Sequence, residues 1–465
     1  RQLTEAFSAA SELSRAFWSE TNAWGAERQR RISLALREAE RCERELIRSA
    51  PESVQEVTPT EFAARLPAEV AVVDLVQQLP YESDGQEDAE LVGYLHCRAA
   101  VDDPRASVRR VRLGIVVVAN PSGIVSYFAA PHADEPRGSG PINGPGRSLR
   151  AVSKRQLARE ALDRIERQLP DHVTSLLLVP DGRSVDFPWA SAFRESAEDS
   201  EQTRRLHLGF HPYQAIETPA SDCRSFLALA GGEFDALRSD PTSTLRSLGD
   251  LPGVAMELTA LRESVATRVD QGAPIFGPWG PSVSGGEANL LHVAGHARSV
   301  DLLRLGYGPE PIDRDEMRWR QELGSWRRMP FVASALVLGD EALQTSPGWE
   351  GSPFLSAAMV ICWPEAMPET VVLATCDPLG GRSIPTSTPD SIAKAFWIAG
   401  AKRILASPDR VADDEPARLL PSLYRRHLEG ASFADAYMAA YRESHADRRR
   451  EQPGHPGHDW CLFGF

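Results

Sequence analysis

Short apolar runs recur along the whole chain, and the segments between them differ between its two halves. In the first half the runs lie close together, and several alternate apolar with polar positions: 70–76, 91–95, 113–118 and 124–128. Alternation with a period of two is typical of strands with one buried face. These runs predict a small, largely antiparallel sheet. A helix at 150–168 and a buried strand from 175 are predicted to follow it.

In the second half, continuously apolar runs alternate with longer segments that have helical spacing. The predicted strands are 226–231, 290–294, 371–375 and 402–407, and the predicted helices are 254–268, 391–399, 417–428 and 433–445. Continuous apolar runs are typical of parallel strands buried on both faces, and strands that alternate with helices favour a doubly wound sheet. The predicted fold class is therefore α/β, with a mostly parallel sheet flanked by helices.

The first 50 residues are polar and charged, with apolar positions at roughly helical intervals and no proline before Pro51. We interpret residues 1–55 as a helical segment, the remnant of a helical-repeat array, although a single pair of helices shows no measurable repeat. The predicted domains are this segment, a smaller α+β half at 56–215 and the doubly wound half at 216–465.

Charge and composition exclude several classes of function. The chain has 465 residues, and 51 Lys and Arg against 65 Asp and Glu give a formal charge of −14. Such an acidic balance argues against a nucleic-acid partner. No apolar stretch reaches the roughly 18–20 residues that a membrane span requires, and no signal peptide is apparent. The six cysteines form no CxxC pair, so we expect a cytoplasmic protein with free thiols, no bound metal and no cofactor.

Two of the predicted strands end in reactive side chains. The run at 290–297 delivers His296, and the run at 371–378 delivers Cys376. The carboxyl ends of parallel strands meet at one edge of a sheet, where ligands and chemistry are usually found. An imidazole at that edge can activate a thiol for nucleophilic attack. We therefore expect a Cys–His dyad, although a cysteine after an apolar run is more often part of a core.

Other histidines and glycines have simpler interpretations. His292 lies four residues before His296, and we read it as a packed histidine in a strand that ends near Gly295. The glycine-rich segment 138–144 lacks the spacing of a phosphate-binding loop and is predicted to be a surface loop. His455 and His458 lie in a Pro/Gly turn, where a solvated loop is favoured over a metal site.

The order of six short segments resembles the CHAT domain, a caspase-like cysteine peptidase module that is related to separase and often fused to tetratricopeptide repeats. The segments are 177–182 with 187–190, 251–253 with 257–258, 292–297, 334–338, 371–377 and 393–407. The resemblance covers about residues 56–465 and implies a caspase-like fold. Two departures are Ala297 in place of a glycine and a longer interval between the histidine and the cysteine, with an apparent insertion at 302–330.

The resemblance also implies roles for individual residues. Cys376 would be the nucleophile and His296 the general base, with the backbone amides of Ala297 and Cys376 binding the oxyanion. The loop after the strand at 402–407 would help to form the substrate pocket, and this loop contains Asp409, Asp413 and Asp414.

The expected function is regulated cleavage of a specific protein substrate in a prokaryotic defence or cell-death pathway, such as antiviral defence. An activator protein would dock on the N-terminal helices. The alternative is a catalytically silent caspase-like fold that serves as a protein-interaction module.

Overall fold

The structure is a computed structural model. It describes residues 58–78, 88–98, 100, 106–119, 125–129, 152–180, 184, 187–198, 204–216, 220, 226–230, 250–265, 275–277, 289–299, 334–337, 354–361, 367–375, 378–379, 381–384, 387–408, 411–451 and 460–464. The predicted helical segment at 1–55, the glycine-rich loop, the apparent insertion at 302–330, His455 and His458 all lie outside the described residues.

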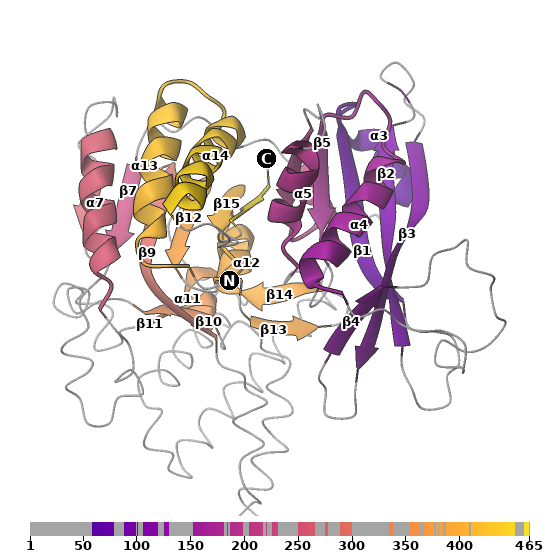
Figure 1. The fold of residues 1–465 in the computed structure, drawn as a ribbon, viewed down its shortest axis with the longest axis horizontal. Helices are drawn as coiled ribbons and strands as arrows, with labels where there is room; N and C mark the ends of the chain where they lie inside the picture. Colours follow the sequence, from indigo (N-terminus) through magenta and orange to yellow (C-terminus); the bar gives the residue numbers. More distant parts are fainter. Residues whose placement is uncertain are drawn as a thin grey trace, which may run out of the picture. The chain divides into compact units, whose positions relative to one another are not determined.

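The chain forms two compact units, which we describe separately (Figure 1). Unit 1 contains residues 219–382 and 390–458, and unit 2 contains residues 56–218, 383–389 and 459–465. The closing segment of the chain thus belongs to unit 2, whereas the sequence-based limits placed it in the C-terminal half. A separate two-stranded sheet pairs β13 (Gly381–Ile384) with β14 (Ser387–Ser391).

Unit 2 is built on a mixed sheet with the strand order β16-β6-β5-β1-β2-β3-β4. The strands from β1 to β4 pair antiparallel, as predicted, while β1, β5, β6 and β16 pair parallel. The strands are β1 (Val70–Gln78), β2 (Asp88–Arg98), β3 (Ala106–Ala119), β4 (Val125–Ala129), β5 (Ser175–Val179), β6 (Arg205–Leu208) and β16 (Cys461–Phe463). Its helices are α3 (Pro59–Arg65), α4 (Lys154–Glu166), α5 (Trp189–Glu198) and the 3₁₀ helix η2 (Pro212–Ile216).

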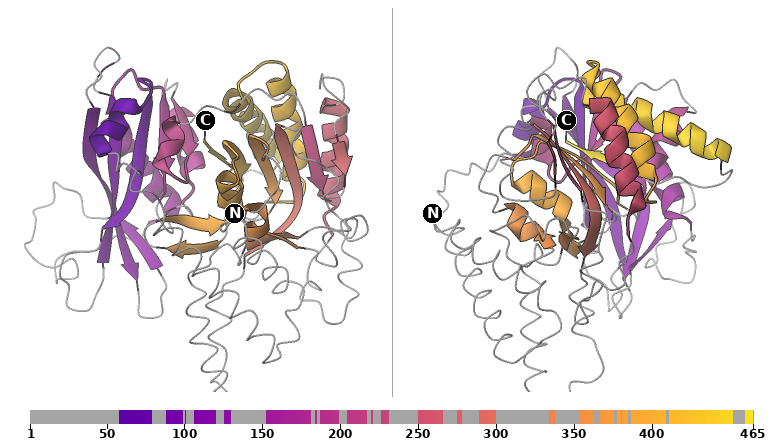
Figure 2. Two further views of the ribbon diagram at one scale, coloured as in Figure 1. Left: turned by 180° about the vertical axis from the view of Figure 1, so that it is seen from behind. Right: turned by 90° about the vertical axis from the view of Figure 1, so that its left-hand side faces the viewer.

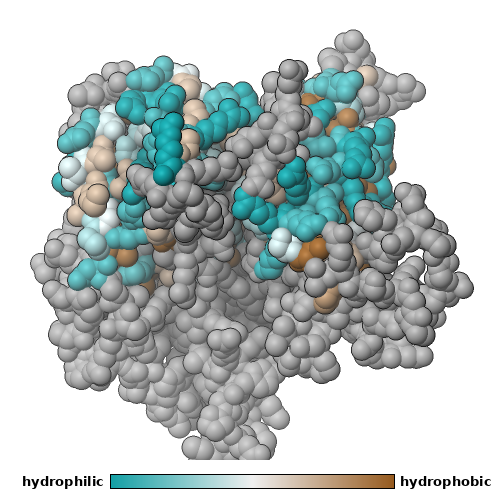
Figure 3. Space-filling model, viewed as in Figure 1, coloured by the Kyte–Doolittle hydropathy of each residue, from teal (hydrophilic) through white to brown (hydrophobic). Residues whose placement is uncertain are grey.

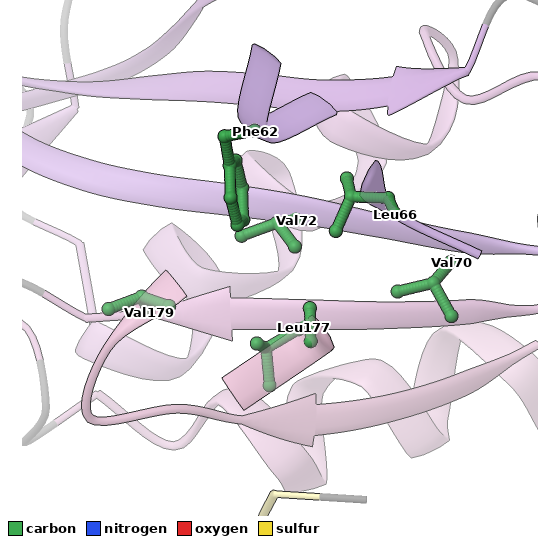
Figure 4. Close-up of a cluster of buried hydrophobic side chains, with 7 residues drawn as sticks. Phe62, Leu66, Val70, Val72, Leu177 and Val179 are labelled. Carbon is green, nitrogen blue, oxygen red and sulfur yellow. The ribbon is translucent and has the colours of Figure 1, made fainter. Parts of the chain in front are cut away.

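Helix α3 begins with a capping box and covers one face of this sheet (Figure 2). The Thr58 hydroxyl accepts a hydrogen bond from the Glu61 amide, and the Glu61 carboxylate accepts one from the Thr58 amide, which forms a capping box. Side chains of the helix and of β1 and β5 form a cluster of buried hydrophobic residues (Figure 4), and Phe62 also meets the buried His96 of β2 edge to face. The cluster consists of Phe62, Leu66, Val70, Val72, Leu177, Val179 and Ala215.

Unit 1 contains the larger, mostly parallel arrangement that the sequence predicts. Strands β7 (Phe226–Ala230), β8 (Ile275–Gly277), β9 (Leu290–Ser299), β12 (Thr370–Thr375) and β15 (Arg403–Ala406) pair parallel in the order β8-β7-β9-β12-β15. Strands β10 (Ser334–Val337) and β11 (Phe354–Ser356) extend the far end of β9 antiparallel. From β7 the chain turns outward to β8 and then returns to β9 on the other side, so the strand order reverses between β7 and β9.

Helices cover both faces of the unit 1 sheet. Helices α7 (Pro252–Val265), α13 (Glu415–Leu428) and α14 (Phe433–Glu451) lie on one face, and α11 (Ala357–Ile361) and α12 (Ile392–Ile398) lie on the other (Figure 2). Where α13 and α14 are visible in Figure 3, their outer surface is mainly hydrophilic. The prediction of a mixed α/β fold with a mostly parallel sheet flanked by helices is therefore confirmed.

Candidate active site

The two strands that were predicted to end in His296 and Cys376 are immediate neighbours in the sheet. Strands β9 and β12 pair in parallel from Thr370 opposite Leu290 to Thr375 opposite Gly295. The next residues in the sequence are His296 on β9 and Cys376 after β12. Cys376 itself lies outside the described residues. The two positions before the predicted dyad therefore lie opposite each other at the carboxyl edge of the sheet.

We expected strand β9 to end near Gly295, but it continues to Ser299. The pairing of β9 changes at that point. Gly295 is the last residue in parallel register with β12, and His296 is the first in antiparallel register with β10, opposite Val337. The expectation failed because the residues after Gly295 carry no apolar pattern and are held as a strand by β10, which is distant in sequence.

His296 is partly exposed at this edge, which is compatible with access by a substrate. Ala297, the predicted source of an oxyanion-binding amide, lies opposite Leu336 in the β9–β10 ladder and is also partly exposed. Alternate residues of an antiparallel ladder direct their amides toward the partner strand or away from it. The extension of β9 thus gives the amides of His296 and Ala297 fixed and opposite directions.

His292, the other histidine of the motif, is fully buried. Its Nδ1 atom lies 2.9 Å from the Tyr424 hydroxyl of α13, and its Nε2 atom lies 3.1 Å from Glu257 Oε1 of α7. The side chains of His292 and Glu257 are 0% and 1% exposed. The His292 ring also stacks on Phe226 of β7, with ring centroids 6.3 Å apart. His292 is therefore held between three elements of unit 1.

Glu257 is a fully buried glutamate whose pKa is raised above its usual value. Burial raises its pKa, the neighbouring His292 opposes that rise, and the charge of Asp413 adds to it. A buried carboxyl group with an imidazole partner can share a proton with it. The sequence gives no sign of this pairing beyond the family likeness at 257–258, because Glu257 and His292 lie on different elements.

Asp413 joins the loop after β15 to the start of α7. Its Oδ2 atom accepts a hydrogen bond of 2.6 Å from the Gly253 amide. This carboxylate therefore satisfies one of the amides left unpaired at the start of a helix. A Cβ atom on Gly253 would lie only 2.0 Å from the Asp413 carbonyl oxygen, so the approach of the loop requires a glycine at this position. The motif at 251–253 is thereby explained by packing.

The three predicted pocket acids are thus placed differently. Asp413 caps α7, and Asp414 precedes α13 and forms an ion pair of 2.9 Å with Arg418. Asp409 lies outside the described residues. Asp413 and Asp414 therefore have structural partners of their own at the carboxyl edge of the sheet.

The helix predicted at 391–399 is present as α12 (Ile392–Ile398). Helix α12 begins at Ile392, with the Ser391 side chain accepting a hydrogen bond from the Lys394 amide, and β13 and β14 come before it. Ser334 of β10 accepts a hydrogen bond from the Ile392 amide and so ties the helix start to the sheet.

In the described part of the chain, no group of His, Cys, Asp and Glu is arranged to hold a metal ion. No helix within that part is long and apolar enough to cross a membrane.

Unit 1 is thus an α/β module with a mostly parallel sheet and a histidine at its carboxyl edge. A family model described as the CHAT domain matches residues 152–464, about two thirds of the chain, and the chain therefore belongs to the CHAT domain family. Membership supports a fold of the cysteine-protease type. The match begins later than the likeness expected from residue 56.

Comparison with solved structures gives a distant similarity to the Arg-specific cysteine proteinase gingipain R, known from a crystal structure. The identity is 12% and the TM-score is 0.36, and the alignment covers 67% of this chain and 66%, just under two thirds, of that chain. A search of curated proteins found no match.

Proposed function

We propose that this protein is a cysteine endopeptidase in which Cys376 and His296 form the catalytic dyad. The observation that carries the proposal is the register that pairs Thr375 with Gly295. Neighbouring strands lie about 4.8 Å apart, so side chains that follow these paired residues start within reach of each other. The family membership and the partial exposure of His296 support the same function.

In the proposed reaction, His296 takes the proton from the Cys376 thiol, and the thiolate attacks the scissile carbonyl carbon. The oxyanion that forms is bound by backbone amides, for which Ala297 and Cys376 are the candidates. The imidazolium returns its proton to the departing amine, which leaves a thioester on Cys376. Water, deprotonated by His296, then hydrolyses the thioester and restores the free thiol. These steps need no metal or cofactor.

For substrate choice, we propose that the loop after β15 contributes a carboxylate to the pocket for the residue before the cut. The candidates are Asp409, Asp413 and Asp414. Because Asp413 and Asp414 have structural partners, Asp409 is the first one to test. A carboxylate favours a cationic or hydrogen-bond-donating side chain and disfavours an acidic one. We therefore expect cleavage after Arg, Lys or a neutral polar residue.

The biological setting is a proposal that rests on the family alone. It is a cytoplasmic protease of a prokaryotic defence or cell-death pathway, such as antiviral defence, with a specific protein substrate and an activator that docks on the N-terminal helices. A cleavage assay on the proteins encoded beside its gene tests both the substrate and the setting.

The dyad is tested by replacing each member. Cys376→Ala should abolish cleavage while the melting temperature stays within a few degrees, because only a small side chain is removed. His296→Ala should cost nearly as much activity, since the two residues act as a unit. Undiminished cleavage by Cys376→Ala would show that the mechanism is wrong.

The alternative is a catalytically silent interaction module that uses the same fold for docking. An iodoacetamide-type probe separates the two functions. Selective labelling of Cys376 over the other cysteines supports the enzyme, and labelling no faster than that of an ordinary thiol supports the silent module.

A further inference from the structure

One face of helix α7 contacts two other elements of unit 1. Gly253 and Glu257 are four residues apart and so share a face of the helix. The Gly253 amide binds Asp413 of the loop after β15, and the Glu257 carboxyl group lies 3.1 Å from His292 Nε2 of β9. Because β9 also contains His296, α7 is linked to both the strand and the loop of the proposed site.

We propose that Glu257 is a positioning residue of the proposed peptidase: it acts through His292 to hold β9 at the height and orientation that present His296 to Cys376. The proposal rests on the proposed function and adds to it two residues that do not touch the substrate.

The way His292 is held argues for a positioning role. Its two ring nitrogens meet polar groups of two different helices: Nδ1 is within hydrogen-bond distance of the Tyr424 hydroxyl of α13, and Nε2 lies 3.1 Å from Glu257 of α7, at ion-pair distance but without hydrogen-bond geometry. The two contacts approach the His292 ring from different helices, so both depend on where β9 places the ring. An apolar pair of similar size would fill the space with little or no loss of stability but would leave that placement less defined.

The effect can reach His296 because β9 is one continuous strand through both histidines. Strand β7 pairs with it as far as Ala294, and β12 pairs with it as far as Gly295. His292 and His296 are four residues apart, about 13 Å along the strand, on the same face of a regular strand. A small displacement at His292 is therefore carried along the strand to His296.

The test measures the pH dependence of Cys376 alkylation by iodoacetamide in the full chain, followed by mass spectrometry of the peptide that contains Cys376. In the parent, the midpoint should lie well below the value of about 8.5 for a free thiol. Glu257→Ala should return the midpoint toward 8.5 and slow alkylation at pH 7 by roughly tenfold. Glu257→Gln, which keeps a polar partner for His292, should restore the lower midpoint.

Two further variants make the test decisive. Glu263→Ala changes an exposed glutamate of the same helix and should leave the midpoint unchanged. Tyr424→Phe removes only the hydroxyl group that contacts His292 and should shift the midpoint in the same direction as Glu257→Ala, by less. It serves as the test if Glu257→Ala does not fold.

The outcomes also distinguish this inference from the proposed function. A lowered midpoint in the parent that stays the same in Glu257→Ala and Tyr424→Phe would overturn the positioning role alone, even if both variants melt earlier. An ordinary midpoint in the parent that His296→Ala does not alter would overturn the dyad and the positioning role together.

Discussion

Two clusters of buried side chains in this protein differ in what they contain. In unit 2, aliphatic and aromatic side chains of α3, β1 and β5, among them Phe62 and Leu177, form a cluster that meets one buried histidine, His96, at the Phe62 ring. In unit 1, α7 and α13 pack on β9 around a histidine, a glutamate and a tyrosine that are equally buried. The first cluster stabilises by area removed from water, which is tolerant of small shifts. The second depends on the orientation of its polar contacts and on the protonation of Glu257.

The largest effect should come from breaking the hydrophobic cluster of unit 2. Leu177→Ala, at a site that is 0% exposed, should lower the stability of unit 2 by about 2–5 kcal/mol, since it removes buried methyl groups and leaves a cavity. Urea denaturation, monitored by hydrogen exchange of the β1 and β5 amides, measures this loss. The loss should be equal at pH 5 and pH 8, and Val108→Ala, at a site that is 38% exposed, is the control. A strong pH dependence for Leu177→Ala would contradict the comparison.

An intermediate effect should follow from Gly253→Ala in unit 1. The added methyl group meets backbone atoms of Asp413, so the loop must move away from α7, at a cost of about 1–3 kcal/mol. Thermal unfolding and limited proteolysis near residue 413 measure the change. Gly430→Ala is the matched control for crowding, since a Cβ atom there meets nothing within 4 Å, although its φ of +101° adds backbone strain. Faster proteolysis near residue 413 in Gly430→Ala than in Gly253→Ala would rule out the steric explanation.

The smallest effect should appear in the pH dependence of Glu257→Gln. Burial raises the pKa of Glu257 in the folded protein, so between the unfolded and folded pKa values the folded state holds a proton that the unfolded chain has released. Stability of the parent therefore falls as pH rises through that window, and the glutamine variant lacks this loss. The variant should gain stability relative to the parent from pH 4.5 upward in urea titrations. A difference that is constant with pH, as expected for Glu263→Gln, would contradict the assigned pKa shift.

These contrasts also show how far the sequence could predict the structure. The apolar runs located β7, β9, β12 and β15, because strands buried on both faces need continuous apolar side chains. The capping box of Thr58 and Glu61 at the start of α3 is an equally local signal. By contrast, β13 and β14 were not predicted, since their polar and proline-containing sequence has no strand pattern.

The residues of the candidate site also differ in whether a local sequence pattern predicts them. His296 and Cys376 were proposed from local pattern and family likeness, and the register of β9 with β12 is compatible with that proposal. The partners of His292 were not predictable, because Tyr424 lies 132 residues away and nothing near it signals a contact. The same holds for Asp413, which caps α7 from 160 residues away.

The contact at Gly253 has a consequence for how this protein can evolve. The neighbour that excludes a side chain there is the main chain of residue 413, which every amino acid possesses. No substitution in the loop after β15 can make room for a larger residue at 253. The loop can vary at positions whose side chains make no such contact, and with it any pocket it forms, while the glycine and the capping side chain of Asp413 are constrained.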